Sequence, residues 1–261
     1  MKSDWLVEMK GISKKFGNVQ AIENVDLELR GGEVLCLVGD NAAGKSTLMK
    51  VLYGSLLADE GTIRFEGQPV SLQSPRDAQA LGIAMIYQDL ALFDNLEVAA
   101  NLCAGREYTR RWFGIQFLDK KKMRSYAENL LTRLKVKVKS TDMRVEKMSG
   151  GQRQMVACGR AIGHDCKVLV MDEPTAALGV KEAGTLLELI KELKNQGMAI
   201  ILITHRLPDV LAIGDRVMVL KGGKRQAALR VDECTLDDLV TLIVRGRDDA
   251  AVLAQTSLSV S

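Results

Sequence analysis

A nine-residue segment that begins at Gly39 has the composition and spacing of a phosphate-binding loop. It fits the pattern GxxxxGK[ST] and lies between a predicted strand at 34–38 and a predicted helix at 46–53, the context that this pattern requires. Backbone N–H groups and the positive end of the helix can surround phosphate oxygens there. Lys45 would supply a positive charge to the β- and γ-phosphates, and the Ser46 hydroxyl would ligate Mg²⁺. The predicted phosphate contacts are Gly39, Asp40, Asn41, Ala42, Ala43, Gly44, Lys45, Ser46 and Thr47.

One position of this loop departs from the usual glycine pattern. Many such loops carry a third glycine where Ala42 stands. Because alanine adopts a positive φ only at a steric cost, we expect Ala42 to have ordinary dihedral angles.

Two carboxylates and a histidine follow apolar strands further along the chain. The run Val168–Met171 leads into Asp172 and Glu173, and a second strand at 200–204 ends beside His205. Asp172 can hold Mg²⁺ through water, and Glu173 can polarise an attacking water molecule. A solvated loop for the carboxylates and a structural role for the histidine are the alternatives. The phosphate loop upstream favours a catalytic function, with His205 in contact with the γ-phosphate.

A second glycine-containing helix start lies at residues 149–152. The sequence there is Ser149-Gly150-Gly151-Gln152, and we expect Ser149 to cap the helix that follows. Two glycines permit a close approach of the backbone, so this terminus is a second candidate anion site. Its position shortly before the Asp172-Glu173-Pro174 strand end makes the pattern specific.

The elements around these residues predict an α/β fold. Short apolar runs alternate with helical patterns, which favours a mainly parallel sheet in one domain spanning residues 1–261. Residues 12–29 favour an antiparallel β subdomain, and residues from about 89 to 165 a charged helical subdomain. Residues 180–195 predict an amphipathic helix, and Thr235 with Asp238 predicts the capped start of a last helix. We expect the tail at 247–261 to fray.

Composition excludes several classes of protein. The net charge is only +3 and aromatic residues make up 4%, so we expect no nucleic-acid partner. The N-terminus has no signal-peptide core, and no apolar run is long enough to span a bilayer. Any membrane function would therefore require a partner. We interpret the five cysteines, none in a CxxC pair, as reduced thiols: Cys36, Cys103, Cys158, Cys166 and Cys234.

Together these motifs resemble those of the ATP-binding subunits of ABC transporters, over nearly the whole chain. Residues 39–47 match the Walker A loop, residues 168–173 match Walker B with its catalytic glutamate, and residues 149–152 match the signature motif. His205 matches the switch histidine. Gln88 matches the glutamine loop, which contacts the nucleotide and its metal. Phe16 stands where that family places an aromatic ring under the adenine, although an isolated phenylalanine is otherwise assigned to the core.

The resemblance implies how such a chain works. It implies ATP and Mg²⁺ as cofactors, Lys45, Glu173 and His205 as catalytic residues, and Ser46, Gln88 and Asp172 as metal contacts. Two copies would face each other head to tail, each signature motif completing the partner's ATP site. The dimer would sit on the cytoplasmic side of the inner membrane, bound to transmembrane permease subunits.

A finer resemblance points to bacterial monosaccharide importers of the ribose and fructose type. It rests on residues 74–78, 82–92 and 174–182, and it implies a periplasmic sugar-binding protein as an indirect partner. Gly179 replaces the aspartate that usually ends the loop after Walker B, so the usual polar contact across the dimer is in doubt. The alternatives are an amino-acid or export transporter, a non-transport ABC ATPase, or a subunit that binds ATP without hydrolysis.

Two further groups of residues have open assignments. Four apolar residues after Gln88 either line a groove for a permease helix or pack within the lobe: Leu90, Leu92, Phe93 and Leu96. The basic cluster at 110–111 and 120–124 either touches a membrane subunit or lipid headgroups or, as we favour, forms a solvated helix face.

Overall fold

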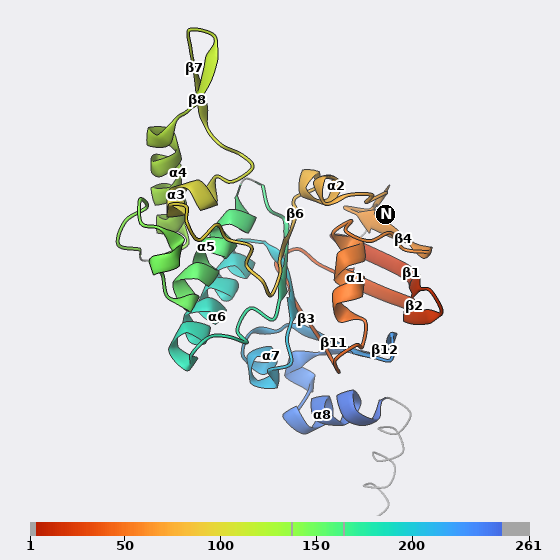
Figure 1. The fold of residues 1–261 in the computed structure, drawn as a ribbon. Helices are drawn as coiled ribbons and strands as arrows, with labels where there is room; N and C mark the ends of the chain where they lie inside the picture. Colours follow the sequence, from red (N-terminus) through yellow and green to blue (C-terminus); the bar gives the residue numbers. More distant parts are fainter. Residues whose placement is uncertain (1–3, 137, 164, 247–261) are drawn as a thin grey trace, which may run out of the picture.

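A six-stranded sheet forms the centre of the molecule in the computed structural model, which describes residues 4–136, 138–163 and 165–246. The strand order is β12-β11-β3-β10-β9-β6, and Figure 1 labels four of these strands, β12, β11, β3 and β6. Neighbouring strands run parallel except for β11 and β12, which form an antiparallel pair. The strands are β3 (Val34–Gly39), β6 (Ile83–Ile86), β9 (Val168–Asp172), β10 (Ala199–Ile203), β11 (Arg216–Lys221) and β12 (Lys224–Arg230). This arrangement confirms the predicted α/β class.

An antiparallel sheet packs beside the central one, across helix α1 (Lys45–Leu52). Its order is β2-β1-β4-β5, and the side chains of both sheets and α1 share one hydrophobic core. The antiparallel pairing predicted for residues 12–29 is therefore confirmed. The strands are β1 (Val7–Phe16), β2 (Val19–Leu29), β4 (Glu60–Phe65) and β5 (Gln68–Val70).

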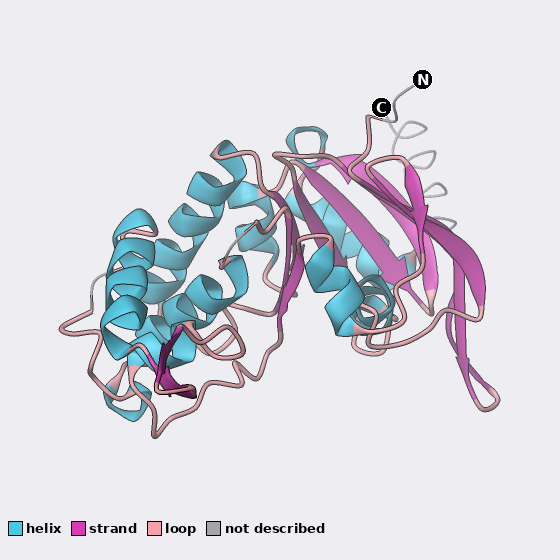
Figure 2. Ribbon diagram, turned by 90° about the horizontal axis from the view of Figure 1, so that it is seen from above, coloured by secondary structure: helices cyan, strands magenta, loops and turns pink. Residues whose placement is uncertain are grey.

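A second core lies on the other side of the central sheet. It joins the sheet to α6 (Val180–Asn195), α7 (Leu207–Ile213) and α8 (Leu236–Arg245), and to the lobe that contains α5 (Gly150–Ile162). Figure 2 shows the helices of this lobe gathered to one side of the strands. The short helix α2 (Pro75–Ala80) precedes β6.

The region predicted to be helical, from about 89 to 165, is only partly helical in its described part. It contains α3 (Val98–Leu102), α4 (Lys120–Arg133), a short 3₁₀ turn at Val145–Lys147, and α5. The expectation of helical structure is wrong for residues 109–118, which form a hairpin of strands β7 (Thr109–Trp112) and β8 (Ile115–Leu118). The two-residue turn Phe113-Gly114 has positive φ angles of 45° and 79°, which closes a hairpin and cannot continue a helix.

Local expectations for the last helix and the cysteines are met. Thr235 caps α8, since its hydroxyl accepts a hydrogen bond from the Asp238 N–H at 3.2 Å. All five cysteines are free thiols, and burial raises the pKa of Cys36 and of Cys158 to about 12. In the part of the chain that the structure describes, no helix is both long and apolar enough to cross a bilayer. The predicted frayed tail at 247–261 lies outside the described residues.

Candidate active site

The loop between β3 and α1 is folded so tightly that two of its glycines have no room for a side chain. A β-carbon on Gly39 would lie 2.0 Å from the carbonyl oxygen of Leu220. A β-carbon on Gly44 would lie 2.5 Å from Cγ2 of the buried Ile22, and Gly44 has a φ of 96°. Neighbouring β-strands therefore fix the loop between the end of β3 and the start of α1.

The expectation for Ala42 is wrong, because its φ is 66°, in the left-handed region. The loop must turn its backbone N–H groups toward a common point, and left-handed residues between right-handed ones produce that concave arrangement. The steric cost for an L-residue is about 1–2 kcal/mol. Ala42 is exposed, so no neighbour adds to this cost.

Lys45 is buried against its own loop, with 8% of its surface exposed. Its ammonium group donates to the carbonyl oxygens of Gly39 at 2.7 Å and Asp40 at 2.8 Å. An ammonium group has three donors, so one remains for a ligand. Burial lowers the pKa of Lys45, while the carboxylates of Glu173 and Asp172 oppose that shift.

Ser46 and Asp172 meet although they are far apart in the sequence. The Ser46 hydroxyl donates to Oδ2 of Asp172 at 3.2 Å, and burial raises the pKa of Asp172. Hydroxyl and carboxylate oxygens are the hard ligands that Mg²⁺ prefers, so this pair fits a magnesium site. Gln88, by contrast, is exposed just beyond β6, and no hydrogen bond among the described residues joins it to Ser46 or Asp172. Its assignment as a metal contact stays a prediction.

Glu173 and His205 form a second pair at the same edge of the sheet. Nδ1 of His205 lies 3.1 Å from Oε1 of Glu173. The register of β9 and β10 sets this distance, since Asp172 lies opposite Ile203 and the Glu173 N–H donates to the Ile203 carbonyl at 2.9 Å. Glu173 has a φ of 48°, and a left-handed non-glycine residue of this kind is typical of functional sites.

A buried hydrogen-bond network, which the sequence did not reveal, supports the loops that carry Glu173 and His205. The Thr175 hydroxyl donates to the buried carboxylate of Asp209 at 2.7 Å. The Arg206 guanidinium donates to the Thr175 carbonyl at 3.3 Å and lies 3.6 Å from Asp209. This network ties the loop after Glu173 to the loop that carries His205. Only the position of Thr175 and Arg206 beside the predicted catalytic residues could have pointed to it.

The segment 149–152 forms the capped start of α5, as predicted. Ser149 Oγ accepts from the Gln152 N–H at 3.3 Å, and Gln152 Oε1 accepts from the Ser149 N–H at 3.1 Å. Gly151 permits close contact with Glu182, whose carboxylate also accepts from the Gly179 N–H at 3.2 Å. Among the described residues, no hydrogen bond or ion pair joins Ser149, Gly150 or Gly151 to residues 39–47.

Comparisons with known proteins identify the family to which this chain belongs. A sequence model of the family described as "ABC transporter" matches residues 22–176. The chain belongs to the ABC transporter family. It is 42% identical to the xylose/arabinose import ATP-binding protein XylG of Sulfolobus acidocaldarius, over 91% of this chain and 93% of that protein. It is 38% identical to the fructose import ATP-binding protein FrcA of Rhizobium meliloti, over 95% and 97%.

Other relatives are longer than this ABC chain. The chain is 44% identical to the ribose import ATP-binding protein RbsA of Caldanaerobacter subterraneus over 93% of its own length, but it spans only 48% of that protein. Among solved structures, it resembles a nucleotide-free ATP-binding cassette from an ABC transporter with a TM-score of 0.80 and 28% identity. That match covers 92% of this chain and 98% of the other. The predicted ABC fold is thereby confirmed.

Phe16, the proposed adenine platform, lies at the end of β1 with 47% of its surface exposed. Its ring faces solvent, 5.9 Å from the Lys14 ammonium group, so it is not part of the core. Exposure leaves the ring free to stack on a base, and its contact with adenine stays a prediction.

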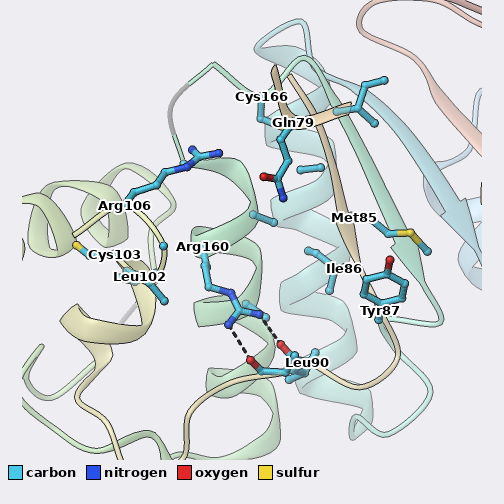
Figure 3. A pocket seen from close by; sticks show the side chains of 18 of the residues that line it. Gln79, Met85, Ile86, Tyr87, Leu90, Leu102, Cys103, Arg106, Arg160 and Cys166 are labelled. Carbon is cyan, nitrogen blue, oxygen red and sulfur yellow. Dashed lines mark hydrogen bonds between the residues drawn. The ribbon is translucent and has the colours of Figure 1, made fainter. Parts of the chain in front are cut away.

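A cavity of about 480 Å³ separates the helical lobe of the ABC domain from the strands, and Figure 3 shows it from close by. The segment after Gln88 forms one wall. The Arg160 guanidinium on α5 donates to the carbonyl oxygens of Leu90 at 2.7 Å and Ala91 at 2.8 Å. Of the four apolar residues considered above, Leu90 and Phe93 line the cavity, whereas Leu92 and Leu96 do not.

The steric account of the Walker A loop is testable with two glycines of nearly equal φ. We expect Gly44→Ala to weaken Mg-ATP binding at least about tenfold, because its β-carbon displaces the loop. Gly197 has a φ of 91° and open space around it, so Gly197→Ala should cost about 1 kcal/mol of stability with ATP affinity unchanged. Calorimetric titration and urea unfolding measure the two quantities. Equal ATP affinity in both variants would contradict the account.

The raised pKa of Asp172 predicts a conflict between stability and activity. The folded chain binds the proton of the Asp172 carboxyl more tightly than the unfolded chain does. Protonation of Asp172 therefore stabilises the fold, and this contribution is fully present below the ordinary pKa of aspartate. It is lost as the pH rises through the raised folded-state pKa. At pH 7, Asp172→Asn should therefore unfold at a higher temperature than the wild type, while Mg-ATP turnover falls on the order of 10²-fold.

Ser46→Ala is the matched control for Asp172→Asn. It removes a hydrogen bond but leaves the half-buried carboxylate, so turnover should fall without a rise in unfolding temperature. A lower unfolding temperature for Asp172→Asn at pH 7 would show that the ionised carboxylate stabilises the fold.

Proposed function

We propose that this chain hydrolyses Mg-ATP as a head-to-tail dimer and thereby powers sugar import through partner membrane subunits. The observation that carries the proposal is the convergence of two pairs beside Lys45. Ser46 lies 3.2 Å from Asp172, and Glu173 lies 3.1 Å from His205, all at the carboxyl edge of one parallel sheet. Ligand sites in such sheets form at this edge.

The chain's own groups would hold the nucleotide at both ends. The N–H groups of residues 39–47 and the free donor of Lys45 bind the phosphates, and the exposed ring of Phe16 stacks on the adenine. Ser46 and Asp172 would hold the metal, with Gln88 as a further contact. When bound, Mg²⁺ neutralises charge that develops on the β- and γ-phosphate oxygens.

Glu173 would act as the general base. Its carboxylate accepts a proton from a water molecule as the water oxygen bonds to the γ-phosphorus, and the bond to the β–γ bridging oxygen breaks, which gives ADP and phosphate. His205 orients Glu173 through the 3.1 Å contact of Nδ1, and Nε2 can donate to a γ-phosphate oxygen when both ring nitrogens carry a proton. The network of Thr175, Arg206 and Asp209 holds both residues in position.

A second copy would complete the site. Ser149 and Gly150 lie on the surface, and the helix N-terminus that they form has no bond to its own Walker A loop among the described residues. An exposed helix terminus of this kind attracts phosphate oxygens. In a head-to-tail pair, residues 149–152 of one copy would meet the γ-phosphate bound by the other.

The cavity beside Leu90 and Phe93 would receive a helix of the permease on the cytoplasmic side of the inner membrane. Arg160 links that wall to α5, the helix that begins at the signature motif. A shift of α5 on ATP binding would therefore reach the permease. Relatives named as xylose/arabinose, fructose and ribose import proteins support sugars as the cargo, delivered by a periplasmic sugar-binding protein.

The role of Glu173 predicts a specific loss. Glu173→Gln should bind Mg-ATP normally but turn it over more slowly by a factor on the order of 10²–10⁴, the usual contribution of a positioned base. It should also accumulate as an ATP-bound dimer in size-exclusion chromatography. Glu188→Gln, on the exposed face of α6, is the control that keeps wild-type turnover. Wild-type turnover of Glu173→Gln at saturating Mg-ATP would refute the assignment.

The import assignment is tested in the assembled transporter. The isolated chain should bind no sugar, whereas the ATPase rate of the reconstituted complex should rise with a sugar-loaded binding protein. Deletion of the gene should abolish uptake of one or a few monosaccharides. Unchanged uptake of every monosaccharide, with loss of efflux or of amino-acid uptake, would reject sugar import and leave the ATPase assignment standing.

A further inference from the structure

The β7–β8 hairpin stands away from the rest of the helical lobe. Every residue of both strands is exposed, and Figure 1 shows the hairpin projecting beyond α4. A two-stranded hairpin is only marginally stable by itself in water. Because its side chains are exposed, they are available to a partner, and their chemistry indicates the kind of partner.

The end of the hairpin is apolar and aromatic. Trp112 pairs with Ile115, and Phe117 pairs with Arg110, so these four side chains share one face. Trp112 is 66% exposed and Phe113, in the turn, is 87% exposed. The Trp112 ring lies 5.0 Å from that of Phe113 and 6.4 Å from that of Phe117, which makes one continuous aromatic surface.

The turn itself carries an unfavourable residue. Both Phe113 and Gly114 have positive φ, and turns of this type favour asparagine or aspartate before the glycine. A bulky residue in the left-handed region is a genuine outlier. The hairpin thus holds a phenylalanine ring at its tip where a small polar residue would fold better, which indicates a function for the ring.

Positive charge lies along the hairpin and at its base. Between residues 109 and 122 there are five basic residues and one acidic residue, a net charge of +4 against +3 for the whole chain. The acidic residue, Asp119, is occupied as the cap of α4. Among the described residues, no ion pair involves the basic side chains of the hairpin and of the first two positions of α4: Arg110, Arg111, Lys120 and Lys121.

The base of the hairpin adjoins the cavity. Tyr108, the residue before β7, lines the cavity, and its carbonyl accepts from the Asp119 N–H at 2.7 Å across the base of the hairpin. The Lys122 ammonium group lies 4.7 Å from the Tyr108 ring. If the cavity receives a permease helix, the hairpin points toward the bilayer that surrounds the permease.

We propose that the β7–β8 hairpin is a lipid contact, which inserts Trp112 and Phe113 into the headgroup region of a bilayer rich in anionic phospholipids. The basic side chains of the hairpin and of its base pair with the lipid phosphates. Aromatic side chains flanked by Arg and Lys are the composition of membrane-interface anchors, and each basic residue near an anionic surface strengthens binding. The proposal rests on the proposed function only for the orientation of the cavity.

Tryptophan fluorescence tests the proposal on the full chain. The chain has two tryptophans, and Trp5 stacks on Arg30 and Arg216, so Trp5→Phe leaves Trp112 as the sole reporter. With vesicles of phosphatidylcholine and phosphatidylglycerol, Trp112 emission should shift to the blue and be quenched by brominated phosphatidylcholine. Vesicles of phosphatidylcholine alone should give a much weaker response, and added salt should weaken the anionic response.

Three variants separate this role from folding. Phe113→Asn suits the turn, so the hairpin should form while binding to anionic vesicles weakens about tenfold. Arg110→Ala with Arg111→Ala should lose the preference for phosphatidylglycerol. Val244→Ser, on α8 at the far end of the molecule in Figure 1, is a matched exposed apolar control and should bind like the wild type. ATPase activity without lipid should be unchanged in all of them, which keeps this test apart from the proposed function.

Three results would overturn the lipid contact. The first is an unshifted, unquenched Trp112 with anionic vesicles, and the second is equal vesicle binding by Phe113→Asn and wild type. The third is a Trp112 shift that appears only with the detergent-solubilised permease and not with lipid, which would assign the hairpin to a protein partner.

Discussion

The parallel register of β3, β9 and β10 is the constraint on which the rest of the site depends. Ile201 lies opposite Leu35 on one side and Val170 on the other, and these strands are buried almost completely. A slip of one residue would turn every side chain to the opposite face, so the core fixes the register. Since parallel strands end at the same edge, the phosphate loop, the two carboxylates and the histidine must meet there.

This convergence places charges where the fold would otherwise exclude them. Lys45 and Asp172 are both partly desolvated, and burial opposes the charged form of each. Ala42 and Glu173 add left-handed backbone at the same edge. The two hydrophobic cores on either side of the sheet offset these costs and hold the elements of the site in place. Such preorganisation is what electrostatic catalysis requires.

Much of the fold follows from local sequence patterns. The strands of the central sheet and the long helices at 120–133 and 180–195 have clear periodicity, and the caps at Ser149 and Thr235 are visible as short motifs. The sequence also identifies the residues of the Ser46–Asp172 and Glu173–His205 pairs. A Gly-Lys-Ser or Asp-Glu motif directly after a buried strand is typical of a phosphate and metal site. Their distances could not be predicted, since strand register is a property of the whole sheet.

The remaining features depend on contacts between distant segments. Nothing local to Ala42 shows that its loop is clamped between neighbouring strands, and the partners Thr175 and Asp209 meet only through tertiary packing. The hairpin was missed because its basic residues and its neighbour α4 suggested one continuous helical region, while the Phe-Gly turn lacks the usual polar residue. The orientation of Leu90 and Phe93 toward the cavity likewise depends on distant contacts. Arg160 of α5 binds the Leu90 and Ala91 carbonyls, and Asn101 of α3 binds the backbone of Phe93.

The two halves of the proposed ATP site lie on different lobes, so the central claim concerns how they meet. A crystal structure of the Glu173→Gln chain with Mg-ATP tests it most directly. The account predicts phosphates within residues 39–47, Mg²⁺ beside Ser46 and Asp172, and Ser149 and Gly150 of a second copy against the γ-phosphate. Nucleotide bound by one copy alone, with both signature motifs in solvent, would contradict the account, as would a metal held away from Ser46 and Asp172.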